Sequence, residues 1–408
     1  MRTLNQVGVY SSQRPTLWLP VCALALVYGM FTFGWMVYRV HLPAQMLQFG
    51  FSEQAAPLLL LIEALLTIAI EPLAGGFSDR TNQRRGTRFP VIAFGAAAAA
   101  LLFVVIPMLA IFTELNSVLN SVIQSVFVGL LLAWSVAMSC FRSPALALLK
   151  RYAPTVRLPQ AASLLTFAVG LAGAAMPLGS QFVLSLGPPI SFTLSALLIL
   201  LSAMWLRWLN PITLTASDSA EHLELVQPVS LIGLGKIFGL GLASTLAFRL
   251  AIETFPKILK AQIPGIHPPT FVGLVFIALA IAALPIGKFA VRQGNSRTML
   301  AGVGVAAVGM ALMPLSHNVP IALLIAVGLG IGFSLIINGT VPFALEQVSP
   351  AHTGLGVGIF FAGAATASSL LQGGLGKPGV LSPAIAIGLG IVMLIAAGAC
   401  IGLTRRGS

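Results

Sequence analysis

The chain has 408 residues, of which 57% are hydrophobic and only 8% are charged, and its formal net charge at pH 7 is +12. A mean hydropathy of +0.98 and many apolar runs of about 18 residues or more indicate a polytopic α-helical membrane protein and exclude an ordinary soluble domain. The basic residues flank these runs, so they indicate membrane topology and contacts with the lipid bilayer, and no nucleic-acid partner is expected.

Apolar segments follow one another along the chain, each near the ~20 residues that cross the hydrocarbon. The sequence predicts an all-α protein with twelve transmembrane helices at residues 18–40, 54–76, 89–112, 117–141, 160–184, 189–209, 229–253, 268–290, 298–316, 319–338, 353–376 and 382–403. The first segment is long enough to span, so we interpret it as a retained helix and not as a signal peptide. The polar segment 210–228 predicts a linker between an N-terminal six-helix bundle (1–209) and a C-terminal one (229–408).

The distribution of lysine and arginine predicts the orientation of these helices. Most of these residues lie in the segments that alternate to the same side as the N-terminus. Cytoplasmic loops of membrane proteins carry the excess of basic residues. We therefore expect both termini in the cytoplasm and a multi-pass protein of the cytoplasmic (inner) membrane.

The two predicted bundles share landmarks in the same order. GGFSDR (75–80) precedes the third helix, and GKFAVR (287–292) precedes the ninth. Pro43 follows the first helix, and Pro256 follows the seventh at a similar offset. These repeats favour an internal duplication. Duplicated halves are an architecture of transporters, in which the substrate site lies between the halves near the middle of the membrane.

The first landmark, Gly-x-x-x-Asp-Arg followed by clustered arginines between the second and third helices, resembles the signature of the major facilitator superfamily. The degenerate second copy and the six-plus-six plan fit the same family, and the resemblance covers essentially the whole chain. Two departures are visible. The family pattern Asp-Arg-x-Gly-Arg-Arg is one residue longer here and lacks its glycine, and Val291 replaces the acid in the second copy. The resemblance implies a fold of two pseudo-symmetric six-helix bundles.

The resemblance also implies that this motif latches the two bundles together on the cytoplasmic side while the outside is open. Arginines can reach the last carbonyls of neighbouring helices, and Asp79 can accept from a facing helix N-terminus. The alternative is a simple positive-inside anchor, for which Asp79 has the wrong sign. The candidate latch residues are Gly75, Asp79, Arg80, Arg84, Arg85, Arg142 and Glu71, with Gly287 and Arg292 in the second copy.

Two further segments, RRGTRFPVIAFG (84–95) and FRSPALALL (141–149), are similar to two branches of the superfamily. One branch contains the glycoside–pentoside–hexuronide and sucrose symporters, and the other delivers bacteriochlorophyll during assembly of light-harvesting complexes. The run from 49 to 80 also looks like uncharacterised cyanobacterial members. The second branch implies an alternative function, a non-transporting assembly factor that binds pigment or a photosystem partner, and a thylakoid location if the source is cyanobacterial.

Glu63 lies near the middle of the second predicted helix, between apolar runs. An ionised carboxylate is expensive at this depth, so we expect Glu63 to be protonated or paired. It is the strongest candidate for a proton-coupling or substrate-contacting group. The alternative is a neutral carboxyl that is hydrogen-bonded to a neighbouring helix.

The seventh helix carries Arg249 and Glu253, whose i, i+4 spacing lets them pair on one face. They predict an outer gate or a site for an anionic group, or alternatively a snorkelling arginine with a surface partner. The first helix carries three aromatic or basic residues at the corresponding level, which could stack on a ring-shaped substrate or form an interfacial belt. These are Trp35, Tyr38 and Arg39. Gln181 and Gln372 are predicted to be buried amides that line the site or join helices.

Other chemistry has no motif in this chain. It contains no G-x-x-x-x-G-K-[ST] loop, no H-E-x-x-H and no cysteine–histidine cluster, so we expect no cofactor, no metal and no enzyme activity. The sequence predicts a secondary active transporter, a symporter for a small-molecule substrate if it is ion-coupled. The proton is the better candidate ion, because a lone buried carboxyl suits it. A third alternative, an exporter of lipid-like compounds, fits the scarcity of polar groups.

Overall fold

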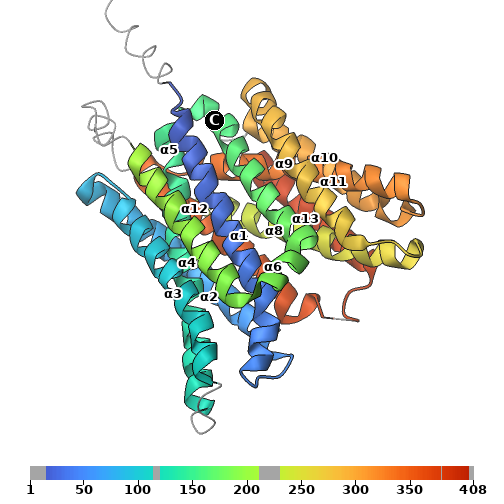
Figure 1. The fold of residues 1–408 in the computed structure, drawn as a ribbon. Coiled ribbons are helices and arrows are strands. Elements are labelled where there is room, and N and C mark those ends of the chain that lie inside the picture. The colour runs from blue at the N-terminus through green and yellow to red at the C-terminus, as the bar shows by residue number, and fades with distance from the viewer. Residues whose placement is uncertain (1–14, 114–119, 211–229, 378, 404–408) are drawn as a thin grey trace, which may run out of the picture.

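The computed structural model describes residues 15–113, 120–210, 230–377 and 379–403, and within these ranges the chain is helical with no β-strand. Eleven of its helices are long and apolar enough to cross a membrane. The predicted all-α class is therefore confirmed. The helices stand side by side in one bundle (Figure 1).

The first six predicted crossings form the N-half, which we define as helices α1 to α6. Its elements are α1 (Trp18–Gln48), α2 (Ala55–Arg85), α3 (Phe89–Thr113), α4 (Asn120–Ala147), α5 (Leu149–Tyr152), η3 (Thr155–Arg157) and α6 (Leu158–Leu209). Within this half, α1 packs on α6, and α3 packs on α4 and α6. An aromatic cluster fills the space between these helices, where Trp134 stacks on Phe103 and lies against Tyr38.

Helix α6 contains two crossings. Gly187 has a left-handed φ of 74° and breaks the helix just before Pro188 and Pro189. The chain turns back there. The two ends of α6 lie close together as a result: the hydroxyl of Tyr152, just before α6, donates to Oδ1 of Asn210, just after it, at 2.8 Å. Eleven helices thus supply twelve crossings, in agreement with the prediction.

The remaining helices form the C-half, defined as α8 to α13. Its elements are α8 (Leu231–Gln262), α9 (Pro268–Gln293), α10 (Asn295–Leu312), η4 (Met313–Leu315), α11 (Val319–Glu346), η5 (Pro350–His352), α12 (Thr353–Leu370), η6 (Leu371–Leu375) and α13 (Pro383–Gly402). The tenth helix was predicted to end at residue 338, which is too early. Helix α11 continues to Glu346 because Asn338 and Thr340 are buried against neighbouring helices and do not mark a surface.

The two halves share internal geometry as well as sequence landmarks. Helices α1 and α8 have 31 and 32 residues, and each runs through a proline placed at the same distance from its first residue, Pro43 and Pro256. The halves meet mainly along two helix pairs, α2 with α12 and α6 with α9, and also where α6 meets α11 and α4 meets α12. The predicted linker lies, apart from Asn210, outside the described residues.

Candidate functional site

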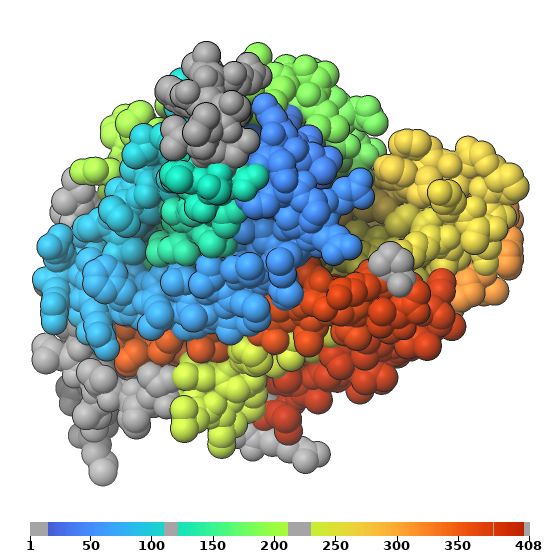
Figure 2. Space-filling view, turned by 90° about the horizontal axis from the view of Figure 1, so that it is seen from below, coloured from blue at the N-terminus to red at the C-terminus, as the bar shows by residue number. Residues whose placement is uncertain are grey.

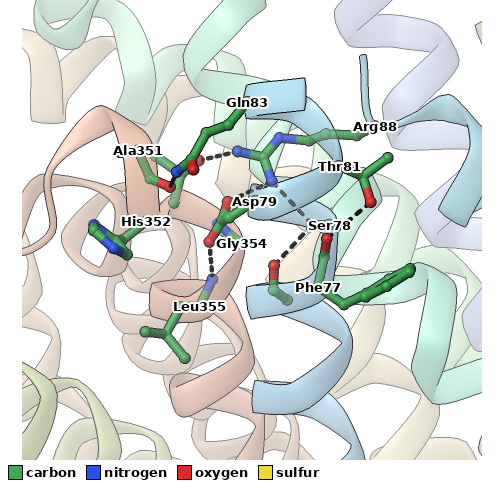
Figure 3. Close-up of polar contacts among 12 residues, drawn as sticks. Phe77, Ser78, Asp79, Thr81, Gln83, Arg88, Ala351, His352, Gly354 and Leu355 are labelled. Atoms are coloured by element: carbon green, nitrogen blue, oxygen red, sulfur yellow. Dashed lines mark hydrogen bonds and ion pairs between the residues drawn. The ribbon is translucent and has the colours of Figure 1, made fainter. Parts of the chain in front are cut away.

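Asp79 lies near the end of α2 and caps the N-terminus of α12 in the other half. It is buried, and its two carboxylate oxygens accept from the amides of Gly354 and Leu355 at 2.9 and 2.8 Å (Figure 3). The residue at the N-cap of α12, His352, makes no side-chain capping bond. The carboxylate of Asp79 therefore satisfies amides that α12 leaves free and lies at the positive end of its dipole.

Arg88 joins the same contact from the start of α3. It is 4% exposed, and its guanidinium forms an ion pair with Asp79 at 2.6 Å. It also donates to the hydroxyl oxygen of Ser78 at 2.9 Å (Figure 3) and to that of Thr353 at 2.7 Å. Because Thr353 begins α12, Arg88 links both halves. We call Asp79, Arg88 and the first turn of α12 the latch cluster.

Glycines allow the helices at the latch cluster to approach each other closely. A Cβ on Gly75 would collide with the carbonyl oxygen of Gly354, and one on Gly354 would come within 2.5 Å of the Gly75 carbonyl oxygen. The next residue, Gly76, faces open space. The first glycine of the motif is thus a packing requirement of α2 against α12. Gly287 has the same role on α9, where a Cβ would come within 2.6 Å of the Ser163 side chain of α6.

Three arginines that the motif predicts to be latch residues lie outside the latch cluster. Arg80, Arg84 and Arg85 are exposed, and in the described part of the chain they form no ion pair. Arg88, which the motif reasoning did not include, is the arginine that binds Asp79. The sequence offered one signal for Arg88. It stands directly before the apolar run of the third helix, where the chain returns toward α2.

Glu71 and Arg142 form a second buried ion pair in the N-half. The Arg142 guanidinium donates to Glu71 Oε1 at 2.7 Å from Nε, and the Ser143 hydroxyl donates to Oε2. Arg142 also lies over the ring of Phe361 on α12, 3.8 Å from its centroid. Arg142 thus connects Glu71 with the other half through a cation–π contact, and the role of the two residues in a latch stays a prediction.

The second copy of the motif has no charged latch among the described residues. Arg292 is exposed there and forms no ion pair, which follows from Val291 standing where the acid would be. Hydrogen bonds to backbone carbonyls join the halves near this copy instead. Asn338 donates to the Pro159 carbonyl at 3.3 Å, and Lys150 Nζ donates to the Leu345 carbonyl at 3.1 Å. Sequence reasoning missed these residues because isolated polar side chains in loops and helix ends carry no motif.

Glu63 and Tyr38 are hydrogen-bonded inside the N-half. The Tyr38 hydroxyl donates to Glu63 Oε1, whereas Glu63 Oε2 is buried without a partner. Tyr38 is fully buried against Trp134, so it belongs to the core and neither stacks on a substrate nor joins an interfacial belt. Trp35 is half-buried beside it and supports the guanidinium of Arg39 at 5.6 Å from the ring centroid.

Arg249 and Glu253 lie on the same face of α8 as predicted, but their contact is long. The Arg249 guanidinium is 3.5 Å from Glu253 Oε1 and donates to the Ser368 hydroxyl of α12 at 3.3 Å. Gln372 is half-buried in η6, and its Oε1 has no partner. Gln181 is exposed, so its predicted burial is wrong, and its role as a group that lines the site stays a prediction.

The hydrogen bonds between the halves gather at one end, although the halves also pack on each other elsewhere, where Leu178 meets Gly273 and Leu61 meets Gly373. Within the described residues, every hydrogen bond between the halves lies where α2 ends and α12 begins, or where α6 begins and α11 ends. We call this the arginine-rich end. Seen from the opposite end, the surface is hollowed between the blue helix α1 and the yellow segment of the C-half (Figure 2). Two helical halves that are bonded at one end and hollowed at the other are the architecture of a membrane transporter.

A family model described as Major Facilitator Superfamily matches residues 24–262, more than half of the chain. The chain belongs to this superfamily. Solved structures share its fold. The human organic anion transporter MFSD10 (TETRAN) is 13% identical with a TM-score of 0.68, and the match covers 94% of this chain and 100% of that one.

A bacterial homologue of the iron transporter ferroportin in an outward-facing state is 16% identical, with a TM-score of 0.72 and coverage of 95% of this chain and 99% of that one. The same homologue with soaked iron matches equally well. A search of curated proteins finds no match.

Proposed function

We propose that the chain is a secondary active transporter of a small solute and that its two halves move as rigid bodies, residues 1–209 against 229–408. The observation that carries this proposal is the confinement of hydrogen bonds between the halves to the arginine-rich end, with a hollow at the opposite end. Alternating access requires such contacts to form at one end at a time.

The arginine-rich end faces the cytoplasm in this proposal. Arg80, Arg84 and Arg85 are exposed there, and basic residues favour the cytoplasmic side. Both termini are then cytoplasmic, the protein resides in the inner membrane, and the structure corresponds to an outward-open state. Opening to the cytoplasm requires the latch cluster to separate from α12, which frees the Gly354 and Leu355 amides for water.

Proton coupling through Glu63 is the second part of the proposal. The carboxyl has one oxygen bound by Tyr38 and one free, so it can bind and release a proton without rearranging a shell of ligands. Arg39 is the charged group that acts on it from α1. Helix α12 and η6, which also pack on α2, contain no acidic or basic residue. One carboxyl and one hydroxyl supply too few oxygens for a sodium site, which favours the proton.

The test uses proteoliposomes that contain a pH-sensitive dye and receive benzoate, succinate or inorganic phosphate as the external solute. We expect a transported solute to carry protons inward, and Glu63→Gln to abolish the proton movement while solute counterflow continues. Glu53→Gln, an exposed carboxyl in the loop before α2, is the matched control and retains both. Unchanged proton movement in Glu63→Gln would contradict the coupling role of Glu63. Failure of every solute to move would contradict the transport proposal.

No specific observation favours the other candidate functions. The pigment or photosystem partner stays a prediction of the subfamily resemblance. An apolar groove of about 600 Å³ lies between α10 and α11, as a lipid-like cargo would require. It is lined by residues of those helices and η4 only, away from the contact between the halves, so it has no place in an alternating-access path.

A further inference from the structure

Polar side chains follow one another along the facing sides of α2 and α4. Glu63, Thr67 and Glu71 are spaced by four residues on α2. Ser139 and Ser143 have the same spacing on α4. This spacing stacks side chains one above another on one side of a helix. Thr67 is half-buried, and the others are at most 2% exposed. We call these five residues the polar column.

Hydrogen bonds join the polar column across the two helices at two levels. The hydroxyl oxygens of Thr67 and Ser139 are 3.4 Å apart, and either can be the donor. One turn closer to the arginine-rich end, the Ser143 hydroxyl donates to Glu71 Oε2. At the other end of the column, Glu63 Oε2 is buried without a partner. The column therefore begins at a carboxyl oxygen that is free and ends at a carboxylate.

The hydroxyls of the polar column differ from other buried hydroxyls of this chain. Ser244 donates to the Leu240 carbonyl at 2.6 Å, and Ser369 donates to the Ala365 carbonyl at 3.0 Å, each within its own helix. That is the ordinary way for a helical serine to satisfy its donor. Ser139 and Ser143 bond to α2 instead. They lie between the only two glutamates of that helix.

The spacing of the polar column suits the passage of a proton. Glu63 and Glu71 are about 12 Å apart along the axis of α2, because each helical residue rises about 1.5 Å. A proton moves between groups that are roughly 3 Å apart or joined by one water molecule. A hydroxyl can accept a proton on its oxygen and give up its own. Successive turns of the column are about 5–6 Å apart, a gap that one water molecule bridges.

We propose that the polar column carries the transported proton from Glu63 to Glu71, toward the arginine-rich end. This inference rests on the proposed function and gives the proton its route. Neutral Glu63 loses the proton and becomes a carboxylate. The hydroxyls of Thr67, Ser139 and Ser143 each accept one proton and pass on another, so they end unchanged. The Glu71 carboxylate receives the proton and becomes the neutral acid.

A proton on Glu71 also changes the contact between the halves. Neutral Glu71 no longer offsets the charge of Arg142, whose guanidinium lies over the ring of Phe361 in the C-half. A buried charge that loses its partner is costly, so Arg142 is stabilised by moving toward water and away from that ring. The other titratable groups that act on Glu71 are Tyr28 and Cys140, which are neutral near pH 7, and α12 contributes none. Arrival of the proton thus favours opening of the arginine-rich end, where Glu71 releases it to water.

The test uses proteoliposomes with a pH-sensitive dye and benzoate, succinate or inorganic phosphate as the external solute. We expect Thr67→Val and Ser139→Ala each to slow proton-coupled uptake about tenfold or more, while solute counterflow, in which the proton stays bound, continues. Thr67→Ser keeps the hydroxyl and retains proton movement. A packing role predicts the reverse, because valine matches threonine in shape and serine does not. Ser125→Ala, which removes an exposed hydroxyl of α4, is the matched control.

Proton movement that persists in Thr67→Val and Ser139→Ala but is lost in Glu63→Gln would overturn the route and leave coupling through Glu63 standing. Equal losses of uptake and counterflow would assign the hydroxyls a structural role and would also overturn the route. Unchanged proton movement in Glu63→Gln would contradict the proposed coupling, and the route with it, as would movement of none of the solutes. Ser139→Ala carries the test if Thr67→Val does not fold.

Discussion

At the scale of single residues, Asp79 is the charge on which the closed arginine-rich end depends. Asp79→Asn removes the negative charge, so Arg88 loses its ion pair and the α12 amides lose their anionic acceptor. Removing one partner of a buried pair costs roughly 3 kcal/mol. This free-energy cost destabilises only the state in which the arginine-rich end is closed. We therefore expect that end to open more often. Spin labels at Arg84 on the N-half and Ala351 on the C-half measure this by pulsed electron resonance.

We expect one short distance in the otherwise unchanged protein and an added longer distance in Asp79→Asn. The control is Arg80→Gln, which removes a neighbouring charge that is exposed and forms no ion pair within the described residues. A distance distribution in Asp79→Asn that matches the control would show that Asp79 does not hold the halves together.

The sequence predicted Asp79 and could not predict which arginine binds it. Asp79 stands out because acidic residues are rare in this chain and because Asp79 belongs to a family motif. Arg80, Arg84, Arg85 and Arg88 look alike in one dimension, and only the turn at Gly86, with its φ of 67°, decides which of them returns to α2.

At the scale of helices, the spacing of α2 and α12 depends on one glycine. Gly75→Ala places a methyl group against the Gly354 carbonyl, a backbone atom that cannot move without shifting the whole helix. Overpacking of this kind costs about 1–3 kcal/mol. We expect Gly75→Ala to lower the Tm and to weaken closure of the arginine-rich end, as seen by faster labelling of a cysteine placed at Ala351.

Gly76→Ala is the matched control, because a Cβ there meets nothing within 4 Å. Alanine is the better helix former by about 1 kcal/mol, so this variant should be neutral or slightly more stable. Equal effects of the two substitutions would mean that the glycines act through helix propensity and not through close packing.

The helices themselves were the part of the fold that the sequence predicted best. Long apolar runs must cross the membrane as helices, because no other element satisfies its backbone in lipid. Helix rotation was harder to predict. Gln181 was expected to be buried and is exposed, since apolar residues cover every face of α6 and hydropathy does not show which side chains are buried. The merging of two crossings into α6 follows from Gly187-Pro188-Pro189, which turns the chain without a polar loop.

At the scale of the whole molecule, transport requires the halves to separate at the arginine-rich end. The Gln83 side chain donates to the Ala351 carbonyl there at 3.3 Å, which places the last turn of α2 in contact with η5 of the other half. We replace the native cysteines, Cys22, Cys140 and Cys400, and introduce Gln83→Cys with Ala351→Cys. A short bifunctional maleimide then joins the halves at this end. We expect the cross-linked protein to lose at least nine-tenths of its solute flux.

Solute binding should survive the same cross-link, because the hollow at the opposite end stays open to the solvent (Figure 2). Loss of flux with retained binding would show that the cross-link blocks movement of the halves and not occupancy of the site. A damaged protein would lose both flux and binding. Two controls carry one cysteine each and are treated with the same reagent. Full flux in the cross-linked protein would mean that solute crosses without separation of the halves, and the latch cluster would then be a static contact.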